Sequence, residues 1–168
     1  MFMEIKIVTP NEAESYNILR LEALLDTPDA FAVLYEDALN KPIEKTRGQL
    51  ASEHSVTFGA YDDGKLIGNM TLMRNTVPKM NHRASIVAVY VSPPYRGTGT
   101  ANDLMKKLME YAETWEGLEQ LDLMVASHNL RAKNFYLRYG FEKYGTEVHS
   151  MKTGDRYIDE DLMVKFIK

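Results

Sequence analysis

The 168-residue sequence contains no cysteine. Disulfides, thiolate metal ligands and thiol nucleophiles are therefore excluded. The four histidines, at positions 54, 82, 128 and 149, form no close pair of the kind that binds zinc, so we expect no metal site. No apolar run approaches the roughly 20 residues that span a bilayer, and the first six residues lack the long apolar segment of a secretion signal. We therefore expect a cytoplasmic protein without a membrane partner.

An excess of basic charge is also lacking, because the formal net charge is −4 at pH 7. This balance argues against a nucleic-acid partner. The apolar fraction of 45% and the charged fraction of 26% are ordinary for a globular protein. A chain of this length favours one domain, residues 1–168, with a sizeable core.

The most informative stretch begins with an apolar strand pattern at residues 86–91, Ile-Val-Ala-Val-Tyr-Val. Two prolines and a glycine-rich segment, residues 96–101, separate it from a helical pattern that runs to Trp115. A glycine loop between a strand and a helix exposes backbone N–H groups at the positive end of the helix dipole, which is typical of a phosphate site. Pro93 and Pro94 cannot donate to a sheet ladder, so we expect the end of the strand to separate from its neighbour.

Two common phosphate loops do not fit this segment. The sequence has no Gly-Lys-Ser or Gly-Lys-Thr run of a Walker loop, and Asn102 stands where the dinucleotide fingerprint has glycine or alanine. The spacing Arg96-x-x-Gly99-x-Ala101 instead resembles the acetyl-CoA signature of the GNAT family of N-acetyltransferases, Gln/Arg-x-x-Gly-x-Gly/Ala. For the loop alone, an ordinary glycine-rich turn is the alternative interpretation.

Hydrophobic periodicity and turn signals divide the rest of the chain into strands and helices. We expect further strands at residues 4–9, 56–61, 66–73, 121–125, 141–151 and 156–166. We expect helices at residues 10–25, 42–52, 100–115 and 129–139, and a short connector or helical turn at residues 30–38. Because a helix connects them, the strands at 86–91 and 121–125 should be parallel neighbours.

A second motif supports the same resemblance. The family pattern Asn-x-x-Ala-x-x-Phe/Leu-Tyr-x-x-x-Gly-Phe is matched at every fixed position by residues 129–141, from Asn129 to Phe141. The flanking residues 20–24, 28–31 and 157–160 are similar to one uncharacterised branch of the family. The resemblance implies a single GNAT domain of mixed α/β class. Its central sheet of about seven mostly antiparallel strands would splay between the fourth and fifth strands, with about four helices around it.

The resemblance also implies the residues that bind the co-substrate acetyl-CoA. The pyrophosphate would lie on the backbone of the loop, which comprises Arg96, Gly97, Thr98, Gly99, Thr100 and Ala101. The strand backbone at Val89, Tyr90 and Val91 would pair with pantetheine, and the N–H of Val91 would polarise the thioester carbonyl. Asn129 would contact the cofactor or serve only as a helix cap.

Tyr136 is the predicted catalytic residue, because a neutral phenol can donate a hydrogen bond and a proton to the departing CoA thiolate. A packed core tyrosine is the alternative. Residues 85–91 contain no acid, although many relatives have a glutamate on this strand. The candidate general bases are therefore Glu36, Asp37 and His82, or a water that relays the proton.

The implied activity is transfer of an acetyl group from acetyl-CoA to a primary amine. Transfer would be direct, in a ternary complex, because an acetyl-cysteine relay needs a cysteine. Protein N-terminal or lysine acetylation, and a non-catalytic acyl-CoA sensor, are the alternatives. A homodimer is left open.

The acidic residues around the expected acceptor groove favour a small cationic amine. They lie in the segment after the first helix and in the terminal hairpin: Asp26, Asp29, Glu36, Asp37, Asp155, Asp159, Glu160 and Asp161. Several carboxylates facing one cleft would concentrate cations. We expect Glu36 and Asp159 to contact the substrate.

Overall fold

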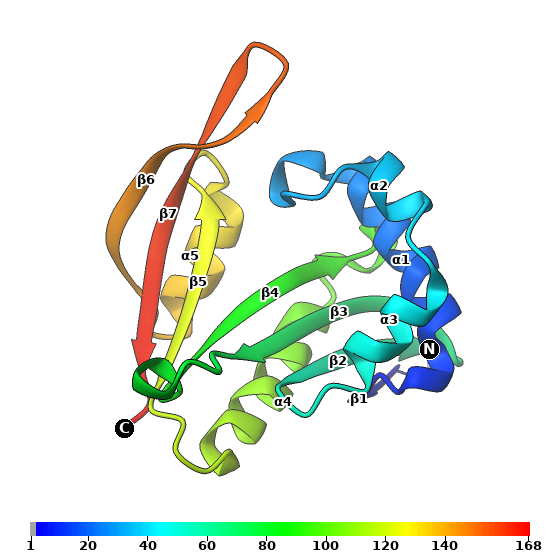
Figure 1. The fold of residues 1–168 in the computed structure, drawn as a ribbon, viewed down its shortest axis with the longest axis horizontal. Helices are drawn as coiled ribbons and strands as arrows, with labels where there is room; N and C mark the ends of the chain where they lie inside the picture. The colour runs from blue at the N-terminus through cyan, green and yellow to red at the C-terminus, as the bar shows by residue number, and fades with distance from the viewer. Residues whose placement is uncertain (1–2) are drawn as a thin grey trace.

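The computed structural model describes residues 3–168. Met1 and Phe2, part of the segment compared with a secretion signal, lie outside the described residues. One mixed sheet has the order β1-β2-β3-β4-β5-β7-β6, which confirms the expected α/β architecture (Figure 1). Its strands are β1 (Met3–Ile7), β2 (Ser55–Asp62), β3 (Lys65–Arg74), β4 (Arg83–Val91), β5 (Gln120–Ala126), β6 (Glu142–Thr153) and β7 (Arg156–Phe166). The helices are α1 (Ala13–Asp26), α2 (Tyr35–Leu39), α3 (Ile43–Leu50), α4 (Thr100–Thr114) and α5 (Leu130–Arg138).

Local signals explain where several elements begin. Thr9 and Glu12 form a capping box, in which the Thr9 N–H donates to Glu12 Oε2 over 2.8 Å, just before α1. Asn129 Oδ1 accepts from the backbone N–H of Ala132 and caps α5 as expected. The segment predicted as a short connector or helical turn at residues 30–38 contains the start of α2, which is the fifth α-helix where about four were expected.

Two helices cover opposite faces of the sheet. On one face, α4 packs its buried Leu104, Met105 and Leu108 into a cluster with the central strands. On the other, α1 packs Leu19 and Ala23 into a second cluster with parts of β2, β3 and β4. Because β2 and β3 are covered on both sides, their interiors are continuously buried rather than alternating.

The sheet divides between β4 and β5. These strands are parallel, as expected, but they pair only where Arg83–Ser85 meets Gln120–Asp122. Figure 1 shows β4 and β5 diverging beyond this short contact. The expectation that Pro93 and Pro94 cause the separation is wrong, because it begins after Ser85 and Val91 still pairs with β3.

A β-bulge lies in the separated half of β4. Ala88 has a φ of +55°, and the register between β3 and β4 shifts between Asn69 and Thr71. The Asn69 side chain is buried, and its Nδ2 donates to the carbonyl oxygen of Ala88 over 2.8 Å. Because a bulge bends its strand, it provides a physical reason for β4 to turn away from β5.

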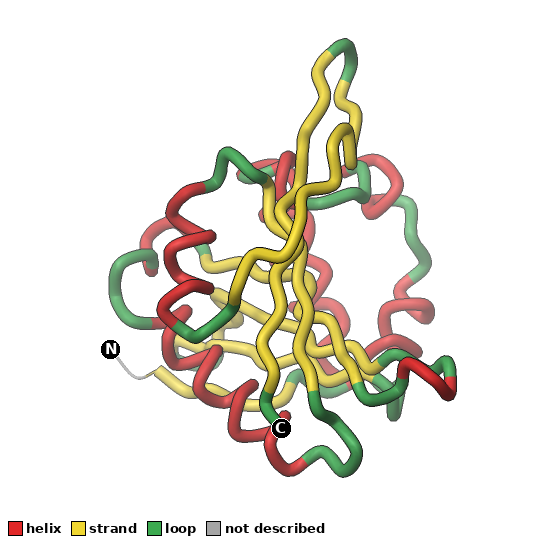
Figure 2. The backbone as a smooth tube through the Cα atoms, turned by 90° about the vertical axis from the view of Figure 1, so that its left-hand side faces the viewer, coloured by secondary structure: helices red, strands yellow, loops and turns green. Residues whose placement is uncertain are grey.

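The β6–β7 hairpin extends beyond the body of the molecule (Figure 2). Among residues 3–168, no helix is both long and apolar enough to cross a membrane. The same residues contain no cluster of histidine and acidic side chains suited to holding a metal ion.

Candidate functional site

A cavity of about 1230 Å³ occupies the space where β4 leaves β5. Its walls are β4 at residues 85–89, β5 at residues 122–126, the start of α5 and the segment that follows α1. Three residues predicted for the site line it: Val89, Asn129 and Tyr136. Beyond Ser85, the described residues supply no strand partner to this edge of β4, so its backbone can pair with a ligand.

The glycine loop lies past the end of β4, outside the residues that line this cavity. Gly97 and Gly99 have φ values of +75° and +89°, and Gly99 is the N-terminal cap of α4. A Cβ at either glycine would meet no described atom within 4 Å, so the backbone surface there is open. No side chain caps this end of α4, and its first N–H groups have no carbonyl partner within the helix. This geometry suits a phosphate.

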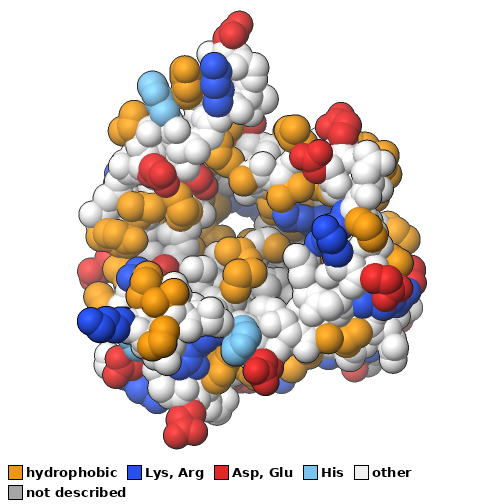
Figure 3. Space-filling view, viewed as in Figure 1, with side chains coloured by type: hydrophobic (Ala, Val, Ile, Leu, Met, Phe, Trp, Pro, Cys, Tyr) orange, Lys and Arg blue, Asp and Glu red, His pale blue; other side chains and the backbone are white. Residues whose placement is uncertain are grey.

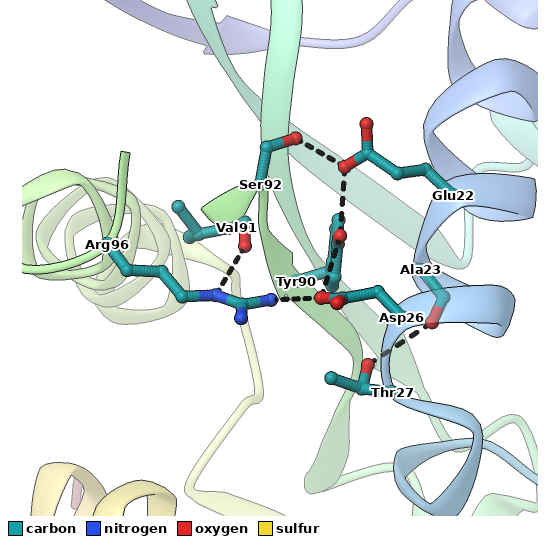
Figure 4. A network of polar contacts seen from close by, with 8 residues as sticks. All are labelled: Glu22, Ala23, Asp26, Thr27, Tyr90, Val91, Ser92 and Arg96. Atoms are coloured by element: carbon teal, nitrogen blue, oxygen red, sulfur yellow. Dashed lines mark hydrogen bonds and ion pairs between the residues drawn. The ribbon is translucent and has the colours of Figure 1, made fainter. Parts of the chain in front are cut away.

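Arg96 is held by its neighbours (Figure 4). Its Nη2 donates to Asp26 Oδ2 over 2.6 Å, and its Nε donates to the carbonyl of Val91 over 2.9 Å. Tyr90 Oη donates to Asp26 over 3.1 Å and to Glu22 over 2.8 Å. The side chains of Tyr90 and Arg96 are therefore directed to the end of α1, which leaves the loop's backbone to face a ligand.

Tyr136 presents its ring from α5. The residue is 6% exposed and packs edge-to-face against Phe135 and Phe141, with centroids 5.5 and 5.9 Å apart. Its hydroxyl makes no hydrogen bond to another described residue, and burial raises its pKa to about 12. A neutral, unpartnered hydroxyl at a cavity wall can donate a hydrogen bond to a bound molecule.

A hydrogen bond joins this helix to the helix behind the loop. Tyr139 Oη, at the end of α5, donates to Asn102 Oδ1 in the first turn of α4 over 2.9 Å. Tyr136 and the open end of α4 therefore belong to one local arrangement, although they are far apart in the sequence.

The two residues predicted to contact substrate lie elsewhere. Glu36 is exposed on α2, and Asp159 Oδ1 accepts from the backbone N–H of His149 over 2.8 Å. Neither lines the cavity. His149 has a φ of +55° in an irregular part of β6, so Asp159 stabilises that local geometry.

Three of the other acids expected to attract a cation are neutralised by partners. Asp29 pairs with Arg156 over 2.9 Å, and Asp26 pairs with Arg96. Asp161 is 1% exposed and lies 2.6 Å from Lys133 Nζ. The charges of these three acids are thus balanced by cations within the fold.

The candidate general bases lie in different parts of the structure. The carbonyl of His82 accepts from residues 119 and 120, at the paired end of β4 and β5, away from the bulge. Asp37 lines a second cavity, of about 870 Å³, between α1–α3 and the sheet. Of Glu36, Asp37 and His82, Asp37 is the one that lines either of these cavities.

Comparison with known proteins identifies the family. Residues 16–141 match the model of the acetyltransferase (GNAT) family. The chain belongs to the GNAT family. Its fold agrees with that of yncA from Salmonella typhimurium, solved with its cofactor acetyl-CoA: the TM-score is 0.86 at 14% identity, covering 100% of this chain and 95% of that one.

Among curated GNAT relatives, the L-amino acid N-acetyltransferase AaaT of Escherichia coli is 28% identical over 104 residues. That match covers 61% of this chain and 63% of AaaT. The spermidine N(1)-acetyltransferase of Escherichia coli is 32% identical over 76 residues, 45% of this chain and 41% of the relative. This GNAT protein therefore matches less than two thirds of the length of either relative.

Three site features of this GNAT protein were absent from the predictions made from the sequence. They are the bulge at Ala88, the hydrogen bond from Asn69 that holds it, and the polar network of Asp26 and Arg96. Each joins residues distant in sequence. Asn69 gave a weak local signal, since an amide inside an apolar strand needs a partner when buried.

Proposed function

We propose that this chain is an acetyl-CoA-dependent N-acetyltransferase that acts on a primary amine of a small molecule. One observation carries the proposal: β4 has an edge without a strand partner after Ser85, and the loop past the end of this strand leads to a helix N-terminus with unpartnered N–H groups. A ligand with a pyrophosphate at one end and a long amide-bearing arm suits both features. The acetyl-CoA complex of yncA and the names of the two curated relatives support the same co-substrate and a small-molecule amine. We also propose a single domain, since β1 and β7 share one sheet.

The proposed binding residues are those the family motifs mark. The backbone of the loop, Arg96 to Ala101, would hold the pyrophosphate, and Val89, Tyr90 and Val91 would pair with pantetheine through their backbone. Asn129, at the cavity wall, would contact the same arm in addition to capping α5. The N–H of Val91 would polarise the thioester carbonyl, as donors in oxyanion holes do.

Acetyl-CoA supplies the acetyl group as a thioester. Transfer is direct, because the chain has no cysteine to carry the group. The amine nitrogen bonds to the acetyl carbon as the carbon–sulfur bond breaks, and Tyr136 Oη donates a hydrogen bond to the sulfur as it gains charge. The amine's surplus proton leaves through Asp37 or through water.

Two measurements test this function. Calorimetric titration should show saturable binding of acetyl-CoA, and a thiol-release assay should show turnover that depends on an added amine, amino acid or polyamine. Acetyl-CoA binding without turnover of any acceptor would contradict the enzyme and favour a sensor module. Acetylation of peptides alone would contradict the small-molecule acceptor.

A further inference from the structure

The second cavity adjoins the first at the β4 bulge. It lies between α1–α3 and the sheet, and four residues line both cavities: Arg20, Val33, Val87 and Ala88. A molecule in the second cavity would therefore reach β4 at the bulge, next to the first cavity. Figure 3 shows Lys or Arg side chains beside the central hollow, on the side where α2 lies.

Four Lys or Arg side chains line this second cavity: Arg20 of α1, Lys41 just before α3, Lys45 of α3 and Arg74 at the end of β3. Arg74 donates to the backbone carbonyls of Asn81 and Glu116. None of the four forms an ion pair with a carboxylate among residues 3–168. Lys41 Nζ donates to the neutral Gln49 over 2.7 Å, and the Arg20 guanidinium stacks on the Phe31 ring, 4.6 Å from its centroid. The cations are thus positioned but not neutralised.

The balance of charge in this cavity is strongly positive. Asp37 is the one acidic residue in its lining. Burial, and then repulsion from Arg20 and Lys45, lower the pKa of Lys41. Burial also lowers the pKa of Arg20. Arg20 and Lys41 are half-buried and Lys45 is exposed. Like charges that lie near one another and are partly withdrawn from water repel, and an anion bound among them would offset that repulsion.

We propose that the acceptor amine carries an anionic group, a carboxylate or a phosphonate, which binds to Arg20, Lys41 and Lys45. This inference rests on the proposed function and names the class of acceptor. A planar guanidinium can bind either oxyanion with two hydrogen bonds, and the lysines add point charges. Because Arg20 lines both cavities, it holds the anionic group while the amine reaches the β4 bulge. The proposal reverses the cationic preference expected from the acidic residues.

Pairs of amines that differ in charge provide the first test. We would compare kcat/KM, at saturating acetyl-CoA, for alanine against alaninamide and for 2-aminoethylphosphonate against ethanolamine, with spermidine as the cationic amine. The anionic member of a pair should be preferred by about tenfold or more, the usual scale for a hydrogen bond to a charged group. The two pairs distinguish a carboxylate from a phosphonate. Equal or better turnover of the amide, of ethanolamine and of spermidine would overturn the inference.

Variants of the cavity provide the second test. Arg20→Gln, and separately the double change Lys41→Gln with Lys45→Gln, should lower kcat/KM for the anionic amine about tenfold or more and change that of its neutral partner far less. Arg20→Lys should restore part of the loss. Lys65→Gln, an exposed change outside both cavities, is the matched control. The double variant keeps the test independent of the packing of Arg20 on Phe31.

The outcomes separate the two proposals. Calorimetry should give wild-type affinity for acetyl-CoA in the double variant, because Lys41 and Lys45 lie outside both the loop and the lining of the first cavity. A protein that binds acetyl-CoA and acetylates neutral or cationic amines in preference overturns the inference and leaves the proposed function standing. A protein that acetylates no amine overturns both.

Discussion

Removal of one hydroxyl tests whether Tyr136 assists the departure of CoA. Tyr136→Phe keeps the ring that packs on Phe135 and Phe141. Because the hydroxyl has no described hydrogen-bond partner, its loss should change the free energy of unfolding by less than about 1 kcal/mol. A large loss of activity would then reflect chemistry rather than damage to the fold.

The structure bounds the size of that loss. Burial raises the pKa of Tyr136 to about 12, whereas an ordinary thiol titrates near ~8.5. Complete proton transfer from the phenol to such a thiolate would cost about 5 kcal/mol, at 1.36 kcal/mol per pKa unit. Tyr136 therefore acts chiefly as a hydrogen-bond donor to the sulfur. Donors of this kind contribute about 10²–10³-fold to kcat.

We would measure kcat by thiol release, with pre-steady-state kinetics to establish that chemistry limits turnover. Tyr136→Phe should lose about 10²–10³-fold in kcat and retain its affinity for acetyl-CoA. Since the phenol remains neutral until the pH approaches 12, the pH profile below about 11 should keep its shape in the variant. Tyr111→Phe, in a similar aromatic cluster outside the cavities, is the matched control. An unchanged kcat under chemistry-limited conditions would refute the role.

Three further predictions follow from the site and its support. Gly99→Val should cost about 1–2 kcal/mol of stability, because the position has a positive φ, and it should also weaken acetyl-CoA binding in calorimetry. The control Gly64→Val, at a φ of +83° in an open hairpin turn, should lose stability but keep its affinity for acetyl-CoA. Equal affinity of the two variants for acetyl-CoA would contradict the phosphate site. Asp161→Asn should cost about 1.5–3 kcal/mol by denaturant unfolding, because it removes the buried carboxylate that pairs with the half-buried Lys133 and accepts from Ser127 and Thr146. The hydrogen bond from Lys133 lowers the pKa of Asp161. The stabilisation by the ionised Asp161 is therefore present above about pH 3.9, and it is lost as the pH falls toward the lower pKa of the folded state. If acid lowered the stability of the wild type no more than that of the variant, this prediction would be contradicted. Asn69→Ala should leave the Ala88 carbonyl without its side-chain hydrogen-bond donor, and it should lower kcat more than it raises the KM for acetyl-CoA. An unchanged kcat would show that the bulge keeps its geometry without this hydrogen bond.

The sequence by itself determined the order of elements and the family. Signals such as the capping pair Thr9 and Glu12, the Asp63-Gly64 turn and the Asn129 cap act over a few residues, so they can be recognised without the fold. The two motifs are equally local, because each occupies one loop or helix that carries its chemistry through backbone conformation. The loop glycines Gly97 and Gly99 have positive φ values, which glycine adopts without the steric cost of a side chain.

Tertiary structure alone decided where the sheet parts and how charge is distributed. The separation after Ser85 and the bulge at Ala88 depend on pairing among β3, β4 and β5, which no short segment encodes. Charge followed the same rule. Asp26 and Arg96 are 70 positions apart in the sequence, and they form an ion pair in the folded chain. An acid that the sequence suggested would attract the substrate is therefore paired internally, whereas cations of α1 and α3 face a cavity. Electrostatic energy depends on distance in space and on burial, and both are set only when the chain has folded.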